Sequence, residues 1–141
     1  MNNALQRFLG AQETAWPEAL SEIQSGRKRS HWMWFIFPQL RGLGTSTIAW
    51  FYGLEGKTEA IHYLTHPILG TRLKQITRIL LECPEQDPWK IFGDIDAMKL
   101  RSCMTLFAEI SGPGSLFEQV LERFFDGQRD SLTLELLKDM P

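Results

Sequence analysis

The sequence predicts an all-α protein that forms a single compact domain of about eight short helices. Apolar residues recur at the three- and four-residue spacing of a helix along almost the whole chain. The alternating pattern of a half-buried strand is nearly absent. The 141 residues contain no repeat or linker, and 43% of them are hydrophobic, which is enough to bury one core. We therefore expect residues 1–141 to fold as one unit.

Two helices are expected at the start of the chain. Apolar side chains within residues 5–9 share one face of a short helix. A second helix covers residues 16–23, where Pro17 suits the first turn because that position needs no N–H donor. Gly26 suits the end of this second helix, because glycine readily adopts the left-handed conformation found there.

Residues 30–37 (SHWMWFIF) form the one segment whose type is ambiguous. Its tryptophan, phenylalanine and isoleucine side chains favour a strand. A single strand would have no partner for its backbone hydrogen bonds, however. We therefore predict a short helix that is apolar on all sides, and hence buried, and that ends at Pro38.

Six further helical segments follow. They cover residues 48–52, 60–66, 67–83, 95–110, 116–125 and 132–137. Side chains suited to N-capping precede three of them, namely Thr45 or Ser46, Asp94, and Asp130 or Ser131. Gly127 stops the fifth of these segments.

The charges are distributed unevenly. The net charge is −2, so the chain lacks the overall basic character of a protein that tracks along nucleic acid, and we expect no extended nucleic-acid surface. Residues 23–54 nevertheless contain no Asp or Glu and include four basic residues, while acidic residues gather toward the C-terminal half. A local site for a small anion is compatible with this distribution.

No membrane, metal or cofactor site is indicated. There is no apolar run of bilayer length and no signal-peptide pattern. Cys83 and Cys103 lack metal-site spacing and are expected to be reduced core residues, so we predict a soluble cytoplasmic protein. His62 and His66 lie four residues apart without a third ligand, and the GKT tripeptide lacks the glycine of a phosphate-binding loop, with Phe51 in its place.

Asp96 and Lys99 are charged residues on the apolar face of the helix predicted over residues 95–110. The apolar stripe consists of Ile95, Leu100, Cys103, Leu106, Phe107 and Ile110, and Ser102 lies on its border. Charges that face a core are costly unless they are paired or used. Either the two residues form a structural ion pair, or they line a pocket in which Asp96 is an acid–base group or ligand acceptor and Lys99 holds an anion.

The loop PQLRGLGTST is a second candidate for ligand binding. Its glycines allow backbone N–H groups to turn inward, and Arg41 and Ser46 add donors at a helix start, as in a cradle for phosphate or carboxylate. The alternative is a turn with an ordinary N-cap. The aromatic block before the loop is similarly ambiguous: it fills the core, or one of its faces stacks on a ring while residues 27–29 hold an anion.

These features define one candidate site. The catalytic candidates are His31, Asp96 and Lys99, and the ligand-binding candidates are Ser30, Trp32, Gln39, Arg41, Gly42, Gly44, Ser46 and Ser102. We expect the Asp96/Lys99 face and the Ser30–His31 end of the aromatic block to meet at one pocket, with the loop of residues 41–46 at its mouth. A single pocket would explain why each segment carries polar groups where its pattern predicts apolar ones.

Five stretches of the chain resemble a small all-helical bacterial family of unknown function that is often labelled calpastatin. They are RFLGAQE (7–13), SGRKRSHWMWFIFPQLRGLG (25–44), YLTHPILGTRL (63–73), IFGDIDAMKLRSCMTLF (91–107) and FFDGQRDSLTLELL (124–137). The resemblance implies an all-α fold but no established activity, so it assigns no catalytic residue. The calpastatin label itself describes a polar, repetitive, disordered inhibitor, whereas five tryptophans and helical periodicity indicate the opposite.

Three functions are compatible with the sequence. The first is binding of a small anionic or nucleotide-like ligand. If this ligand is also a substrate, hydrolytic or transfer chemistry by acid–base catalysis fits best, with His31 or Asp96 as the base. The second is a non-catalytic protein-interaction module whose aromatic block is all core. The third, by analogy with other small helical families, is an enzyme that acts on compounds of the ADP-ribose type.

Overall fold

The computed structural model describes residues 3–140, which form eight α-helices and no β-strand. A short 3₁₀ helix, η1 (Asn3–Leu5), precedes them. The α-helices are α1 (Gln6–Gln24), α2 (Met33–Ile36), α3 (Thr47–Tyr52), α4 (Lys57–Thr65), α5 (Leu69–Glu82), α6 (Pro88–Ser111), α7 (Leu116–Phe125) and α8 (Ser131–Lys138). The all-α prediction is confirmed. None of the helices in residues 3–140 combines the length and hydropathy needed to cross a membrane.

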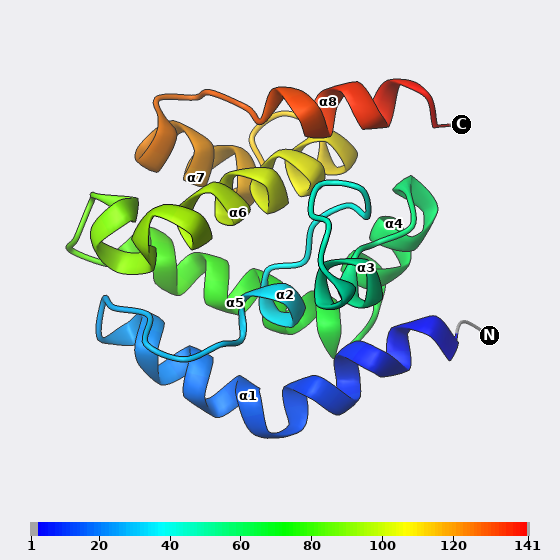
Figure 1. Cartoon of the computed structure of the whole chain (residues 1–141). Coiled ribbons are helices and arrows are strands. Elements are labelled where there is room, and N and C mark those ends of the chain that lie inside the picture. The colour runs from blue at the N-terminus through cyan, green and yellow to red at the C-terminus, as the bar shows by residue number, and fades with distance from the viewer. Residues whose placement is uncertain (1–2, 141) are drawn as a thin grey trace.

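Helix α6 runs through the middle of the molecule, and the other helices pack around it. In Figure 1, α7 and α8 lie above α6, while α5 and then α1 lie below it. A row of aromatic rings joins these layers, because Tyr63 of α4 contacts Phe8 of α1 and Phe107 of α6, with ring centroids 5.0 and 5.9 Å apart. Phe107 in turn lies 5.5 Å from Phe117 of α7. The core therefore reaches from α1 to α7.

Helix α1 is one helix where the sequence pattern predicts two. Pro17 lies inside it rather than in a first turn, and Figure 1 shows the helix bending along its length, as expected where a proline removes a backbone hydrogen bond. The spacing of apolar residues suggested two helices because one position that faces the core is polar. Gln12 is only 1% exposed, and its Nε2 donates hydrogen bonds to the Phe35 carbonyl (2.7 Å) and the Tyr63 hydroxyl (3.1 Å).

Helix α6 begins earlier than predicted and is interrupted at Gly93. Asp87 caps its start by accepting a hydrogen bond from Trp89 N at 2.9 Å. Gly93 has φ 81° and ψ 170°, a conformation that favours glycine and that breaks the helix into two parts. Ile95 lies in the first turn after this break and is 73% exposed, so its predicted place in the apolar stripe is wrong.

The aromatic block of residues 30–37 is mostly core, although its helix is only the four residues of α2. Trp32, Met33, Ile36 and Phe37 are each at most 2% exposed. Trp34 is only half-buried. Phe35 is also half-buried and packs on Tyr52, whereas the Trp34 ring becomes part of the candidate site.

Candidate functional site

Glu22 of α1 fixes the loop that leads into α2. Its Oε1 accepts hydrogen bonds from the backbone N–H of Arg29 (2.6 Å) and Ser30 (2.9 Å) and from the indole Nε1 of Trp32 (3.0 Å). Its Oε2 accepts a hydrogen bond from the Ser30 hydroxyl at 2.6 Å. Burial alone would raise the pKa of this carboxyl, but the hydrogen bonds outweigh it and lower the pKa to about 2. The loop is therefore held by a carboxylate that stays ionised at neutral pH.

The loop residues alternate between solvent and protein. Arg27, Arg29 and His31 are exposed, whereas Lys28 and Ser30 are partly buried. Ser30 faces Glu22, and the backbone N–H of Lys28 donates to the Ile91 carbonyl at 2.7 Å. The solvent-facing side chains of the loop are therefore two arginines and one histidine.

The inward side of the loop meets α6 at an ion cluster. Lys28 Nζ lies 2.8 Å from Asp96 Oδ2, and Lys99 Nζ lies 3.2 Å from Asp96 Oδ1. The Lys28 side chain is 7% exposed, while those of Asp96 and Lys99 are 20% exposed. Lys28 also donates a hydrogen bond to the Ser30 carbonyl. Asp96 is thus paired on both oxygens, and the Ser30 loop lies beside it.

Each of the two lysines also lies over a tryptophan ring. Lys99 Nζ is 3.9 Å from the centroid of Trp34, and Lys28 Nζ is 4.9 Å from that of Trp32. Such contacts are favourable because the ring face is electron-rich. Gly44 reaches the same place from the following loop, since a Cβ there would lie 3.6 Å from Trp34. Two of the three predicted segments therefore lie beside the Trp34 ring.

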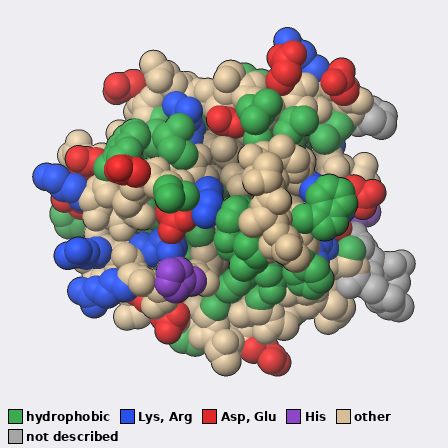
Figure 2. Space-filling view, in the orientation of Figure 1, with side chains coloured by type: hydrophobic (Ala, Val, Ile, Leu, Met, Phe, Trp, Pro, Cys, Tyr) green, Lys and Arg blue, Asp and Glu red, His purple; other side chains and the backbone are tan. Residues whose placement is uncertain are grey.

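An open hollow lies next to this cluster. Its volume is about 510 Å³, and it is lined by Phe92, Gly93, Asp94, Ile95, Asp96 and Lys99. The face shown in Figure 2 carries acidic, basic and hydrophobic side chains close together. A shallow surface of this kind is accessible to a small polar ligand, although the carboxylates at its rim do not favour an anion deep within it.

The catalytic candidates are only partly assembled. Asp96 and Lys99 form an ion pair, but the ring of exposed His31 makes no hydrogen bond or ion pair with any residue in the described range 3–140. A general base is normally oriented by a hydrogen bond. Nothing in this arrangement orients His31 for proton transfer.

Three of the ligand-binding candidates are buried. Trp32 is 1% exposed and its indole N–H is used by Glu22, so it offers no free ring face. Ser102 is 7% exposed, and its hydroxyl donates to the Met98 carbonyl of its own helix at 3.2 Å. Gln39 is also 7% exposed, and its backbone carbonyl accepts a hydrogen bond from Leu54 N.

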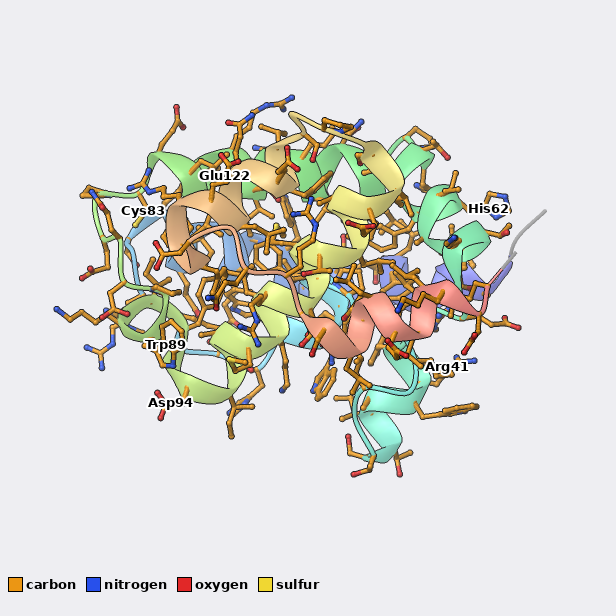
Figure 3. All side chains as sticks on the ribbon, turned by 90° about the horizontal axis from the view of Figure 1, so that it is seen from above. Arg41, His62, Cys83, Trp89, Asp94 and Glu122 are labelled. Carbon is orange, nitrogen blue, oxygen red and sulfur yellow. The ribbon has the colours of Figure 1, made fainter. Side chains whose placement is uncertain are left out.

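Arg41 is directed away from the ion cluster. Its guanidinium lies 4.3 Å from the ring of Trp50, and its Nε donates to the Trp50 carbonyl at 2.9 Å. Figure 3 shows Arg41 and Asp94 well apart, toward opposite sides of the view. The expectation that Arg41 lies at the mouth of the Asp96 site therefore differs from the structure.

The rest of the glycine loop has structural contacts. Ser46 is an ordinary N-cap, because its Oγ accepts a hydrogen bond from Ala49 N at 3.1 Å. Gly42 has φ 106°, and a Cβ there would lie 3.7 Å from a methyl of Leu136 in α8. Gly44 packs against Trp34, as described above. The loop forms no ring of inward N–H groups around an anion.

Three residues that organise the site are not among the individual candidates named from the sequence. Glu22 carries no motif, and only its hydrogen bonds reveal its role. Lys28 stands among three consecutive basic residues, where the sequence does not show which one turns inward. Trp34 is one of several aromatics, and its partial exposure depends on how α2 meets α6.

Residues 3–140 contain no group of three or more His, Cys, Asp or Glu side chains placed to hold a metal ion. His66 uses its Nδ1 to accept hydrogen bonds from the backbone N–H of Ile68 (3.1 Å) and Leu69 (3.2 Å). That nitrogen therefore has a structural role at the start of α5.

Comparison with known proteins places the chain in a family. A family model described as "Protein of unknown function (DUF1810)" matches residues 2–137. The chain belongs to this family. A solved structure, that of the conserved hypothetical protein Rv1873 from Mycobacterium tuberculosis, is similar over 95% of this chain and 96% of that chain, with 42% sequence identity and a TM-score of 0.92. A comparison with curated proteins gives no match. Neither the family description nor the name of that structure mentions calpastatin or an activity.

Proposed function

We propose that this DUF1810 protein binds a small anionic, nucleotide-like ligand at a cationic face, defined as Arg27, Arg29, His31, Trp34 and Lys99. The observation that carries this proposal is the charge balance of the loop. Arg27 and Arg29 are exposed, and no residue in the described range 3–140 forms a salt bridge with either. The carboxylates beside the loop, Glu22 and Asp96, are already engaged.

Two unpaired guanidinium groups on one short loop favour an anion with several oxygens. Arginine donors match phosphate and carboxylate oxygens in pairs. Because Glu22 and the Ile91 carbonyl hold the loop backbone, little ordering is required when such a ligand binds. Trp34 supplies half-exposed aromatic surface beside Lys99, which suits a ligand that also carries a ring.

Binding fits this geometry better than catalysis does. Acid–base chemistry by His31 would need a partner that orients the imidazole, and Asp96 is occupied by Lys28 and Lys99. The hydrolytic, transfer and ADP-ribose alternatives are therefore secondary. They are tested by looking for breakdown of ADP-ribose under the conditions used for binding.

The experiment is a thermal-shift series with phosphate, pyrophosphate, ADP and ADP-ribose at constant ionic strength. A ligand at about one hundred times its Kd adds about 2.7 kcal/mol to stability, which raises the Tm by several degrees. We expect pyrophosphate and ADP to stabilise the wild type, with ADP acting more strongly because of Trp34. The double variant Arg27→Gln/Arg29→Gln should lose most of this shift, and Lys99→Met part of it.

Arg78→Gln is the matched control, because Arg78 is an exposed cation on a different element, α5, and is not part of the cationic face. It should respond to each compound as the wild type does. An absence of stabilisation by all four compounds would refute the proposal. So would an equal loss of response in Arg78→Gln, which would indicate general charge screening.

A further inference from the structure

The segment around α3 stands out from the body of the protein. Figure 3 shows α3 projecting beyond the neighbouring helices. The base of the projection is closed by backbone pairing, since Leu54 N donates to the Gln39 carbonyl (2.9 Å) and Arg41 N donates to the Leu54 carbonyl (2.8 Å). The residues of this segment are not those of the cationic face, although Gly44 in the loop before α3 lies against Trp34.

Helix α3 exposes large apolar side chains that it could have buried. Ile48 is 42% exposed, Trp50 62% and Phe51 52%. Only Ala49 is buried, and Tyr52 packs on Phe35 with ring centroids 5.0 Å apart. Exposed clusters of aromatic side chains are characteristic of protein–protein interfaces.

The exposed side chains are presented on a firmly held backbone. Ser46 caps the start of α3. At its end, Arg41 Nε donates to the Trp50 carbonyl at 2.9 Å and Arg7 Nε donates to the Phe51 carbonyl at 2.7 Å. Both ends of a six-residue helix are thus fixed from outside it, which lowers the entropy lost on binding.

Arg41 gives the surface a chemical preference. Its guanidinium lies 4.3 Å from the Trp50 ring, and only its Nε has an acceptor within residues 3–140. Glu59 forms its ion pair with Arg7 at 3.0 Å and feels the charge of Arg41 without forming a salt bridge to it. Two terminal nitrogens of Arg41 therefore remain as donors beside an exposed indole. A carboxylate accepts two such donors in parallel.

We propose that the α3 patch, defined as Arg41, Ile48, Trp50 and Phe51, docks a peptide segment of a partner protein that carries Asp or Glu next to a large apolar side chain. The apolar part would cover the patch, and the carboxylate would pair with Arg41. This site shares no residue with the anion site proposed above, so each proposal is tested by its own variants.

Charge disfavours the other occupants of this surface. A symmetric contact between two copies would bring the two α3 patches together and place one Arg41 near the other. An anionic membrane surface is normally recognised by a cluster of several basic residues, whereas this patch contains one. An acidic peptide complements a single arginine beside an apolar surface.

The test begins with selection of a phage-displayed random peptide library against the immobilised full chain. The enriched sequences should combine Asp or Glu with an aromatic or branched apolar residue. A synthetic peptide of the consensus should bind the wild type in a fluorescence polarisation assay. We expect Trp50→Ala and Arg41→Gln each to weaken binding about tenfold or more, as central interface residues do.

Two further changes examine the role of the carboxylate. Changing the acidic residue of the peptide to its amide should weaken binding to the wild type but not to Arg41→Gln, because the pair is already lost. Arg41→Lys should restore only part of the affinity, since lysine lacks the forked donors. Trp50 and Arg41 have side chains at the surface, and circular dichroism confirms that each variant is folded before its affinity is compared.

Leu132→Ala and Arg78→Gln are the matched controls, since one removes a half-exposed apolar side chain on α8 and the other an exposed cation on α5. Neither should change the affinity. The proposal is overturned if no peptide is enriched, if enriched peptides lack acidic residues, or if the α3 variants bind as well as the wild type. It is also overturned if Trp50→Ala abolishes self-association seen by light scattering, or binding to phosphatidylserine vesicles.

Discussion

Glu22 is the residue on which the loop before α2 depends. It is 9% exposed and accepts four hydrogen bonds, all from residues 29–32. Burial opposes ionisation, but these donors stabilise the carboxylate and hold its pKa near 2 instead of 4.5. Because the folded state lowers this pKa, Glu22 contributes stability above about pH 4.5. That contribution falls as the pH drops from 4.5 toward 2.

Glu22→Gln should destabilise the protein at neutral pH by about 2–3 kcal/mol, because an amide cannot accept all four donors and brings its own N–H groups among them. The free energy of unfolding of the variant should also vary less between pH 4.5 and pH 2 than that of the wild type. Urea unfolding at several pH values measures both effects. Glu18→Gln, on the exposed side of α1, is the control and should change stability by less than about 0.5 kcal/mol. Equal pH profiles for wild type and Glu22→Gln would contradict this role.

The junction of α4 and α5 depends on a close backbone approach at Gly70. A Cβ at this position would lie 1.9 Å from the carbonyl oxygen of Leu64 and 3.2 Å from that of Tyr63. These are backbone atoms of α4, which cannot move without disturbing the packing of Tyr63 in the core. Glycine is therefore required here by space rather than by its φ angle.

Gly70→Ala should destabilise the protein by about 3 kcal/mol or more, because it forces α4 and α5 apart. Gly10→Ala is the matched control within another helix, since nothing lies within 4 Å of a Cβ at that position of α1. It should instead stabilise by about 0.5–1 kcal/mol through the unfolded-state entropy of glycine. Thermal unfolding of both variants measures the difference. If Gly70→Ala and Gly10→Ala both stabilised the protein, the close contact at Gly70 would not constrain the junction of α4 and α5.

At the scale of elements, the sequence predicts most helices, and the errors have physical causes. Helices α3, α5, α7 and α8 agree with the apolar periodicity and with capping by Ser46 and Asp130. The pattern divided α1 because buried Gln12 replaces an apolar residue on the core face. It placed Ile95 in the core because periodicity does not show that the first turn after Gly93 lies at the surface.

The candidate site was predictable only in part. The ion pair of Asp96 and Lys99 follows from their spacing on one helix, and the structure has it. The involvement of Lys28 depends on a contact between segments 68 residues apart, counted from residue 28 to residue 96, and local patterns carry no such information. Arg41 was assigned to this site because it precedes a glycine loop, but its side chain turns to Trp50 instead.

At the scale of the whole molecule, the two cysteine thiols differ in how far they lie from the protein surface. The structure contains Cys83 and Cys103 as free, buried thiols, in agreement with the sequence prediction. Cys103 lies in the middle of α6 and is 0% exposed, and burial raises the pKa of its thiol well above the ordinary value. Cys83 follows the last turn of α5, is 5% exposed, and borders a surface hollow of about 530 Å³.

These positions predict different rates of alkylation in the native protein. Cys83 should react first, because fraying of the last turn of α5 is enough to expose it to the reagent. Cys103 should react at least about a hundredfold more slowly, since its thiolate forms only when α6 separates from the core, which requires nearly global unfolding. Iodoacetamide labelling followed by mass spectrometry of the peptides measures both rates, and in concentrated urea the two thiols should react at similar speed. A Cys103 that reacts as fast as Cys83 in native buffer would mean that α6 opens locally and is not the centre around which the other helices are packed.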